Sequence, residues 1–96
     1  MLSFYAKEEF FMEYIVISYR SRAHTVRFAE FLRKSGTYCQ IINTPKEAGV
    51  GCGLSVRISV SDLISAKRAV KITAFSSFAG FFHVKIAGGR RQIKSI

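Results

Sequence analysis

The residue of this sequence best suited to covalent chemistry is Cys52, which lies between two glycines in the stretch NTPKEAGVGCGLSVRI. Gly51 and Gly53 allow the backbone to adopt left-handed angles and leave room for a bulky partner to approach the sulfur. Thr44 and Pro45 stiffen the beginning of the same loop. Most lone cysteines are buried as small apolar side chains, but a thiol in a loop of this kind is suited to nucleophilic chemistry.

The hydrophobic pattern predicts the elements that position this cysteine. A nearly continuous apolar run predicts a buried strand over residues 14–19. Ser21 is a typical N-cap for a helix over residues 22–34, and Gly36 is suited to end it. The spacing i, i+3, i+4, i+7 predicts that one face of this helix packs in the core, formed by Thr25, Phe28, Ala29 and Leu32. The remaining elements expected are strands at 37–43, 53–60 and 80–87, and a second helix from Ser61 or Asp62 to about Lys71.

This order of elements predicts an α+β fold, namely a ferredoxin-like βαββαβ sandwich with a four-stranded antiparallel sheet and two helices on one face. The right-handed crossover rule places the third strand between the first and the second. A chain of 96 residues forms one domain, which we expect over residues 14–87. Residues 1–13 are then an N-terminal extension, and residues 88–96 a basic C-terminal tail.

In this topology the loop with Cys52 lies at the same end of the sheet as the start of the first helix. A helix start offers free N–H groups and a partial positive charge, which stabilise a thiolate over a thiol, as do nearby basic side chains. The residues expected to stabilise the Cys52 thiolate in this way are Arg20, Ser21, Arg22 and His24.

Cys39 is a different case, because it lies inside a predicted strand. We expect it to be buried, opposite roughly Arg57, and too far from Cys52 for a disulfide. No metal site is predicted, since the sequence has no CxxC motif and His24 and His83 are not spaced as ligands.

No cofactor is predicted either. The glycines of the loop around Cys52 open a strand instead of a helix, so they lack the geometry of a phosphate-binding loop.

The composition is basic, with 15 Lys and Arg against 6 Asp and Glu and a net charge of +9. This charge favours an anionic partner, although only the tail GGRRQIKSI forms a basic cluster. The third strand presents Ser55, Arg57 and Ser59 where stacking aromatics would be needed. Binding to nucleic acid is therefore expected to be weak, non-specific and lost with salt.

The sequence predicts no membrane insertion, because no run approaches the roughly 18 apolar residues of a membrane span. The beginning of the chain lacks a secretion signal, and two cysteines are too few for a disulfide scaffold. A cytoplasmic protein is expected. The segment KITAFSSFAGFF, residues 71–82, holds four phenylalanines, which predicts either a satellite core or a homodimer contact.

Three stretches together resemble the selenium/sulfur carrier protein-like family, over about residues 14–84. They are IVISYRSRAH (15–24), NTPKEAGVGCGLSVRI (43–58) and SDLISAKRAV (61–70). The resemblance implies a ferredoxin-like carrier whose Cys52 holds a persulfide or perselenide between a donor, such as a cysteine desulfurase, and an acceptor protein. It implies weak sulfurtransferase-like activity at most, and no stand-alone enzyme.

Two other functions remain open from the sequence. The first is a ferredoxin-like ligand- or protein-binding module, in which the glycine loop is a hinge or a lid and Cys52 is incidental. The second is an RNA-binding domain that uses the open sheet face, which the polar residues of the third strand disfavour.

Overall fold

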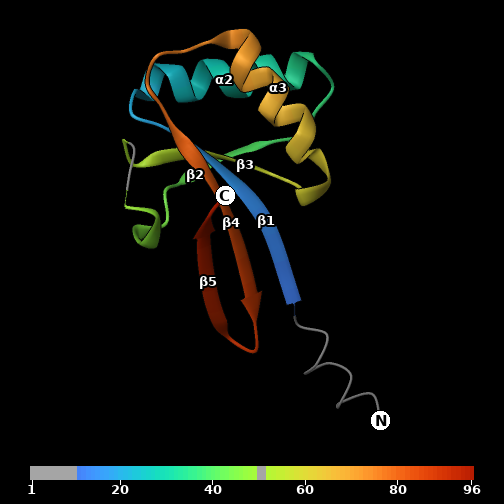
Figure 1. Cartoon of the computed structure of the whole chain (residues 1–96), viewed down its shortest axis with the longest axis vertical. Helices are drawn as coiled ribbons and strands as arrows, with labels where there is room; N and C mark the ends of the chain where they lie inside the picture. The colour runs from blue at the N-terminus through green and yellow to red at the C-terminus, as the bar shows by residue number, and fades with distance from the viewer. Residues whose placement is uncertain (1–10, 50–51) are drawn as a thin grey trace.

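The protein is described here by a computed structural model that covers residues 11–49 and 52–96. It contains a five-stranded antiparallel sheet in the order β2-β3-β1-β4-β5, with two α-helices on one face (Figure 1). The elements in chain order are β1 Phe11–Tyr19, α2 Arg22–Lys34, β2 Gln40–Asn43, the 3₁₀ helix η1 Lys46–Ala48, β3 Leu54–Ile58, the 3₁₀ helix η2 Val60–Asp62, α3 Leu63–Thr73, β4 Phe78–Ala87 and β5 Arg90–Ser95. As predicted, β3 lies between β1 and β2.

The sheet has five strands, so the prediction of four was wrong. Arg90–Ser95, expected to be a free basic tail, forms β5 and pairs with β4. Gly88 and Gly89 join the two strands with φ angles of 59° and 80°, as a two-residue hairpin turn requires. Only Ile93 in β5 is apolar and partly buried, so the hydrophobic pattern gave no sign of this charged edge strand.

The first strand is also longer than predicted. Phe11–Glu13, assigned by sequence to an N-terminal extension, continue β1 and pair with β4. Residues 1–10 of that extension lie outside the described residues.

Helix α2 has the predicted bounds, and its local chemistry explains them. The side-chain oxygen of Ser21 accepts a hydrogen bond from the backbone N–H of His24 at 3.2 Å, which caps the helix start. Gly36 follows the last turn with a φ angle of 90°, a left-handed conformation that ends helices. The buried face consists of Thr25, Phe28, Ala29 and Leu32, as the spacing predicted.

The core is divided between the two faces of the sheet. The helix side holds the main cluster, in which Tyr19, Phe28, Ile15, Ile17 and Leu32 are almost completely buried. The opposite face holds a smaller cluster of Tyr14, Val16, Phe82 and Val84, against which Ile42, Ala48, Ile86 and Ile93 pack. The four phenylalanines of residues 71–82 also pack in the core: Phe75, Phe78 and Phe81 in or against the main cluster, and Phe82 in the smaller one. They form no satellite core of their own, contrary to one of the two predictions for this segment.

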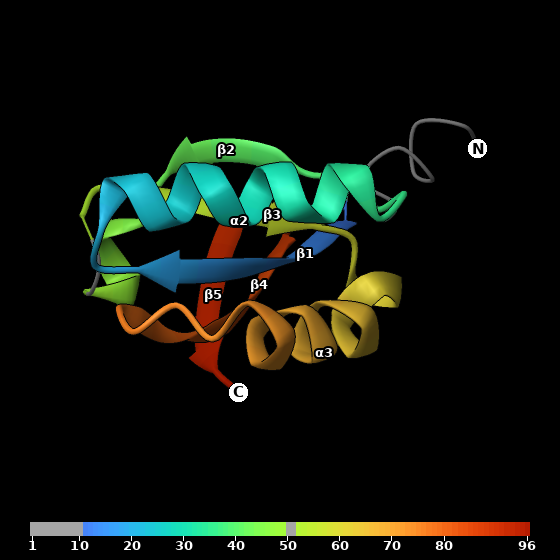
Figure 2. The same ribbon diagram turned by 90° about the horizontal axis from the view of Figure 1, so that it is seen from above.

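The helices cover only part of the sheet. Figure 2 shows α2 and α3 on the same side of the sheet, on either side of β1. Strands β1, β4 and β5 extend beyond them as a three-stranded ribbon (Figure 1). Within the described residues, neither helix is long and apolar enough to cross a membrane.

Candidate functional site

Cys52 lies two residues before β3, and its side chain is half-buried. Its sulfur lies 3.8 Å from the side-chain oxygen of Thr25 and 3.7 Å from the backbone carbonyl oxygen of Leu54. Since Thr25 belongs to the first turn of α2, the cysteine lies beside the N-terminal end of that helix. This is the neighbourhood that the topology predicted.

The Thr25 hydroxyl is a polar group in an otherwise apolar helix face. It is fully buried, and it donates to the backbone carbonyl of Ser21 at 3.1 Å. In this orientation its oxygen is free to accept from the Cys52 thiol, while rotation of the hydroxyl would direct its hydrogen at a thiolate. Thr25 therefore has hydrogen-bonding capacity for both protonation states of the cysteine.

The residues that the sequence named as thiolate stabilisers lie around the same helix start, but their side chains contact other groups. Ser21 caps α2, and its backbone N–H donates to the side-chain oxygen of Ser77 at 3.2 Å. The Nδ1 atom of His24 lies 2.6 Å from the same oxygen, and the His24 ring stacks on Phe75 at 4.9 Å. His24 thus holds the connection between α3 and β4 against α2.

The two arginines of this group are exposed to solvent. Arg20 donates to the backbone carbonyl of Phe78 at 3.5 Å, and Arg22 lies at the first position of α2. Within the described part of the chain, the hydrogen bonds and ion pairs join neither arginine to Cys52. The neighbour that sequence reasoning missed is Thr25, which was assigned only to the core face of the helix.

The loop that presents Cys52 is closed at its base by the predicted loop residues. The backbone N–H of Thr44 donates to the carbonyl of Gly53 at 2.9 Å, and Pro45 is buried before η1. Gly53 has a φ angle of 98°, where any other residue would be strained. Gly51 lies outside the described residues.

A chain of three hydroxyl groups begins at this loop, in which Thr44 is half-buried. The side-chain oxygen of Thr44 lies 2.6 Å from that of Ser55, which lies 2.9 Å from that of Ser18. Ser18 and Ser55 are fully buried, although the sequence analysis placed Ser55 on an open face. This side of the sheet is not open, because Thr44 bonds to Ser55 and Ala48 of η1 packs against the smaller cluster there.

An ion pair fastens the same loop to the last strand. The Arg91 guanidinium donates to both carboxylate oxygens of Glu47, at 2.8 Å and 3.0 Å through Nη2 and 3.2 Å through Nε. A hydrogen bond from the backbone of Glu47 itself, followed by the bonds from Arg91, holds the pKa of this carboxyl below its usual value of 4.5. The C-terminal strand therefore helps to position the loop with Cys52.

Cys39 differs from Cys52 in each respect that bears on reactivity. Its side chain is 3% exposed, and its thiol donates to the backbone carbonyl of Ala29 at 3.5 Å. Burial raises the pKa of this thiol, although the neighbouring Arg33 acts in the opposite direction. Strand β2 begins at Gln40, so the prediction that Cys39 lies inside a strand was wrong: it lies just before one. Gln40 pairs with Arg57, one position from the predicted pairing of Cys39 with roughly Arg57. Both cysteines are free.

The described residues give no sign of a metal centre, since no three of their His, Cys, Asp and Glu side chains are grouped to hold an ion. His83 lies instead beside Glu13, with 2.8 Å between Nε2 of the histidine and Oε1 of the glutamate. The chemistry that the site offers is therefore that of one accessible thiol beside a helix start.

Comparison with known protein families gives one match. Residues 14–74 match the model of the family described as "Putative Se/S carrier protein-like", which is more than half of the chain. The matched residues contain Cys52, Thr25 and the whole loop between β2 and β3. Neither the curated proteins nor the solved structures contain a match to this chain.

Proposed function

The chain belongs to the Se/S carrier protein-like family, and from this premise we propose that it carries sulfur or selenium as a persulfide or perselenide on Cys52. The observation that supports this residue is its position: a half-buried thiol at the start of β3, with Thr25 in the first turn of α2 beside it. Cys39 is unsuited to the role because it is buried and its pKa is raised.

The transfer would proceed by thiolate attack on a donor persulfide. The Cys52 thiolate attacks the outer sulfur, so that a bond forms between Sγ and that sulfur while the S–S bond of the donor breaks. The donor cysteine leaves as a thiolate. The transferred sulfur keeps its oxidation state, and no external oxidant or reductant is needed. Delivery is the same step in reverse, in which an acceptor nucleophile takes the outer atom and Cys52 leaves as a thiolate.

The surroundings of Cys52 suit both steps. The Thr25 hydroxyl can donate to the sulfur when it is a thiolate, before loading and after delivery. The partial positive charge of the first turn of α2 acts in the same direction. The exposed guanidinium groups of Arg20 and Arg22 lie at the same helix start, where they would attract an anionic persulfide on an approaching partner.

The proposal extends to the class of partner and to the setting. A donor such as a cysteine desulfurase and a separate acceptor protein are required, since the chain would hold the atom between them without being a stand-alone enzyme. The two free thiols agree with a reducing, cytoplasmic location. The order β2-β3-β1-β4 with two helices on one face supports a ferredoxin-like classification, to which β5 is an addition.

The test is the intact mass of the protein after incubation with a cysteine desulfurase and cysteine. We expect the added mass of sulfur on the wild type and on the Cys39→Ser variant, its loss in Cys52→Ser, and its removal by a thiol reductant. The same assay with selenocysteine as the donor substrate compares selenium with sulfur.

The control for Cys52 is thus the second cysteine of the same chain. Sulfur that appears on Cys39, or on neither cysteine, would favour the alternative in which the fold is a ligand- or protein-binding module and Cys52 is incidental.

A further inference from the structure

The three-stranded ribbon beyond the helices has one face that the carrier function does not use. In β4 and β5, His83 lies opposite Lys94, Lys85 opposite Gln92, and Ala87 opposite Arg90. Opposed residues of antiparallel strands point to the same side of the sheet. Strand β1 adds Phe11 opposite Ala87 on that side. We call this surface the ribbon face, formed by Phe11, His83, Lys85, Arg90, Gln92 and Lys94.

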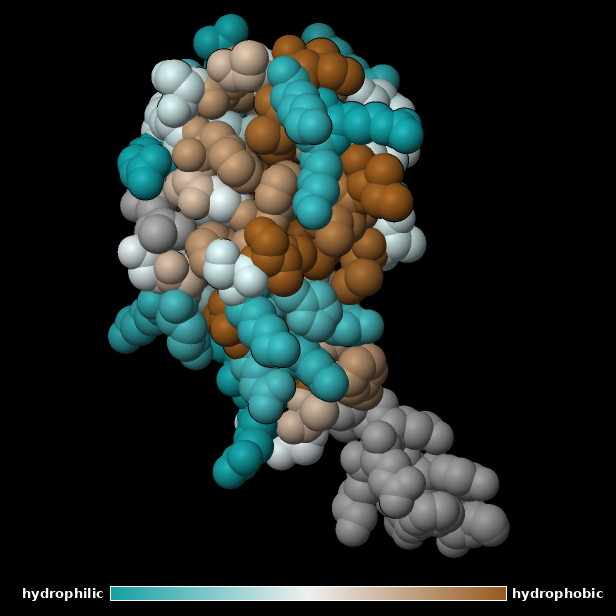
Figure 3. All heavy atoms as spheres, in the orientation of Figure 1, coloured by the Kyte–Doolittle hydropathy of each residue, from teal (hydrophilic) through white to brown (hydrophobic). Residues whose placement is uncertain are grey.

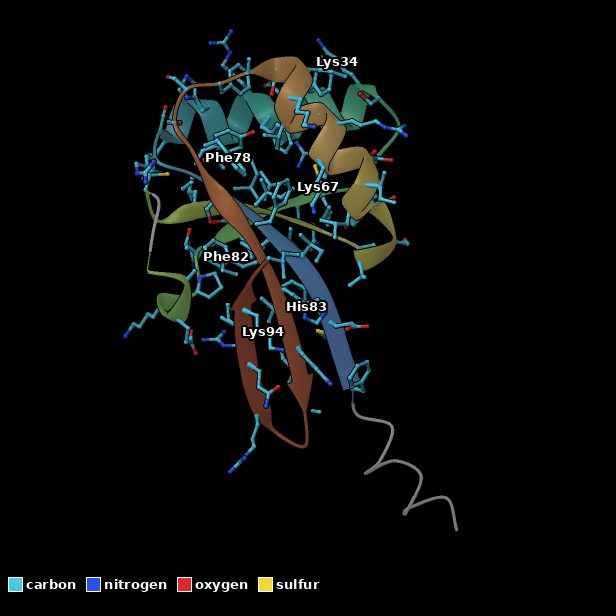
Figure 4. All side chains as sticks on the ribbon, in the orientation of Figure 1. Lys34, Lys67, Phe78, Phe82, His83 and Lys94 are labelled. Atoms are coloured by element: carbon cyan, nitrogen blue, oxygen red, sulfur yellow. The ribbon has the colours of Figure 1, made fainter. Side chains whose placement is uncertain are left out.

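The ribbon face carries cations that are not neutralised. Lys85, Arg90 and Lys94 are exposed, and within residues 11–49 and 52–96 no carboxylate pairs with them. Glu13 lies on the same side opposite Lys85, but its carboxylate pairs with the His83 ring and not with the lysine. Figure 4 shows His83 and Lys94 on the neighbouring strands β4 and β5. Figure 3 shows hydrophilic side chains gathered over this strand-only part of the molecule.

The other face of the ribbon is different. There the Arg91 guanidinium is paired with Glu47, and the Arg57 guanidinium lies 4.0 Å from the centre of the Tyr14 ring. Among residues 11–49 and 52–96, the free cations of the ribbon therefore lie on the ribbon face, because these arginines of the opposite side are engaged within the fold.

Two shallow hollows lie among the side chains of the ribbon face. One, of about 130 Å³, is lined by His83, Lys85, Gln92 and Lys94. The other, of about 180 Å³, is lined by Lys85, Ala87, Arg90 and Gln92. Apart from Ala87, the lining residues of both hollows have hydrogen-bond donors, and none of those in the described part of the chain is a carboxylate. This is the chemistry that binds a phosphate group.

Phe11 adds an aromatic ring to this basic surface. The ring is 50% exposed, and the Lys85 ammonium lies 5.6 Å from its centre. An aromatic ring beside a row of cations is how proteins hold single-stranded nucleic acid without reading its sequence. A protein partner would instead favour an apolar centre with few lysines, which this face lacks.

We propose that the ribbon face binds the phosphate backbone of single-stranded nucleic acid, with one base stacked on Phe11 and no preference for base sequence. The affinity of such binding falls steeply as the salt concentration rises, like any attraction due to net charge. It differs from a general charge effect because it is confined to one surface of the protein. All six residues of the ribbon face lie outside residues 14–74, so this surface is separate from the part of the chain that matches the carrier family.

Fluorescent oligonucleotides of single-stranded RNA and DNA, titrated from low to physiological salt, test the proposal. The ribbon variant Lys85→Gln/Arg90→Gln/Lys94→Gln is compared with the control Lys34→Gln/Arg68→Gln/Lys71→Gln, which removes the same charge from exposed positions of α2 and α3. We expect the ribbon variant to bind at least about ten-fold more weakly at intermediate salt. Its log–log salt slope should be shallower by about 2, since roughly 0.7 is lost for each phosphate contact.

Three outcomes would overturn the proposal. The first is a control variant that loses as much affinity as the ribbon variant, because binding would then follow net charge alone. The second is a Phe11→Ala variant that binds as tightly as the wild type, where the loss of stacking predicts about ten-fold weaker binding. The third is polyglutamate that competes as well as RNA, which would indicate an acidic protein as partner. Urea denaturation of the same variants provides an independent check that they are folded.

Discussion

The side-chain oxygen of Thr25 and the sulfur of Cys52 lie 3.8 Å apart, although 27 positions separate the two residues in the chain. Helix α2 contributes the hydroxyl from its buried face, and the loop before β3 contributes the thiol. Burial of Thr25 means that water does not readily take the place of its hydroxyl. This contact joins the helix start to the proposed carrier atom.

Replacing Thr25 with valine should slow the reaction of Cys52 with iodoacetamide at neutral pH about five-fold. Valine keeps the shape of the side chain and removes a hydrogen bond worth about 1 kcal/mol to the sulfur. Rates should be measured by mass spectrometry in a Cys39→Ser background. Thr25→Ser keeps the hydroxyl and should react nearly as fast as the parent protein. Equal rates for the valine and parent proteins would mean that Thr25 does not stabilise the thiolate.

Replacing Ser55 with alanine should lower the free energy of unfolding by about 1–3 kcal/mol, because the hydroxyls of Ser18 and Thr44 each lose a buried partner. Urea denaturation measures the change. Ser65→Ala on the exposed side of α3 is the control, expected within about 0.5 kcal/mol of the wild type. In the double variant with Ser18→Ala, the loss should be smaller than the sum of the two single losses. Full additivity would contradict a shared hydrogen-bonded chain.

The sequence was sufficient to predict the elements whose signals are local. Helix α2 has a serine cap, an apolar face with the spacing of a helix, and a glycine after its last turn. In β3, apolar residues alternate with polar ones, and Val56 and Ile58 lie in the main cluster. The predicted position of the third strand between the first two then placed Cys52 at the N-terminal end of α2.

What the sequence did not indicate depends on distant residues. Strand β5 is stabilised by its pairing with β4 and by Ile93, so its own composition resembles a tail. Its only local signal is the Gly88-Gly89 pair, which is typical of a hairpin turn. The sequence signal for the Thr25–Cys52 contact is equally weak. It is a hydroxyl-bearing residue at a position on the buried face of the helix, where an apolar residue is expected. Ser55 is buried on the side of the sheet where it bonds to Thr44 and Ser18, and no pattern within β3 shows that.

The ion pair between Glu47 and Arg91 should release the loop with Cys52 at acid pH. Since the pKa of Glu47 is lowered in the folded protein, the contribution of the pair is fully present above the usual value of 4.5 and is lost as the pH falls through the folded-state pKa. Hydrogen exchange at the amides of Ala48 and Gly49 reports the release, because both bond within η1.

The comparison for this prediction is the Glu47→Gln variant at each pH. Glutamine cannot titrate, so near neutral pH the two amides should exchange faster in the variant than in the wild type. This difference between the two proteins should vanish below the folded-state pKa of Glu47. A difference that stays constant through the acid range would show that the carboxylate does not hold the loop.

Replacing Tyr19 with phenylalanine should leave the free energy of unfolding unchanged at neutral pH or raise it by up to about 1 kcal/mol. The Tyr19 ring is fully buried between Phe28, Phe75 and Phe78. Its hydroxyl is buried and makes no hydrogen bond of good geometry in the described part of the chain, although the Thr73 side chain lies near enough to oppose the effect of burial on its pKa. The substitution therefore keeps the packing and removes an unsatisfied polar atom.

The same tyrosine should make the folded protein sensitive to alkali. Burial raises the pKa of Tyr19 from 10.0 to about 12, so between these values the unfolded chain loses the proton while the folded protein keeps it. The free energy of unfolding must then fall as the pH rises through this range, by up to about 1.4 kcal/mol per pH unit. The contribution of Tyr19 to this loss ends above pH 12. Urea denaturation of the wild type and of Tyr19→Phe from pH 8 to pH 12 separates this effect from that of the other titrating groups. The phenylalanine variant should lose less stability over the range, and parallel losses in the two proteins would mean that the Tyr19 hydroxyl ionises as readily in the folded state as in the unfolded one.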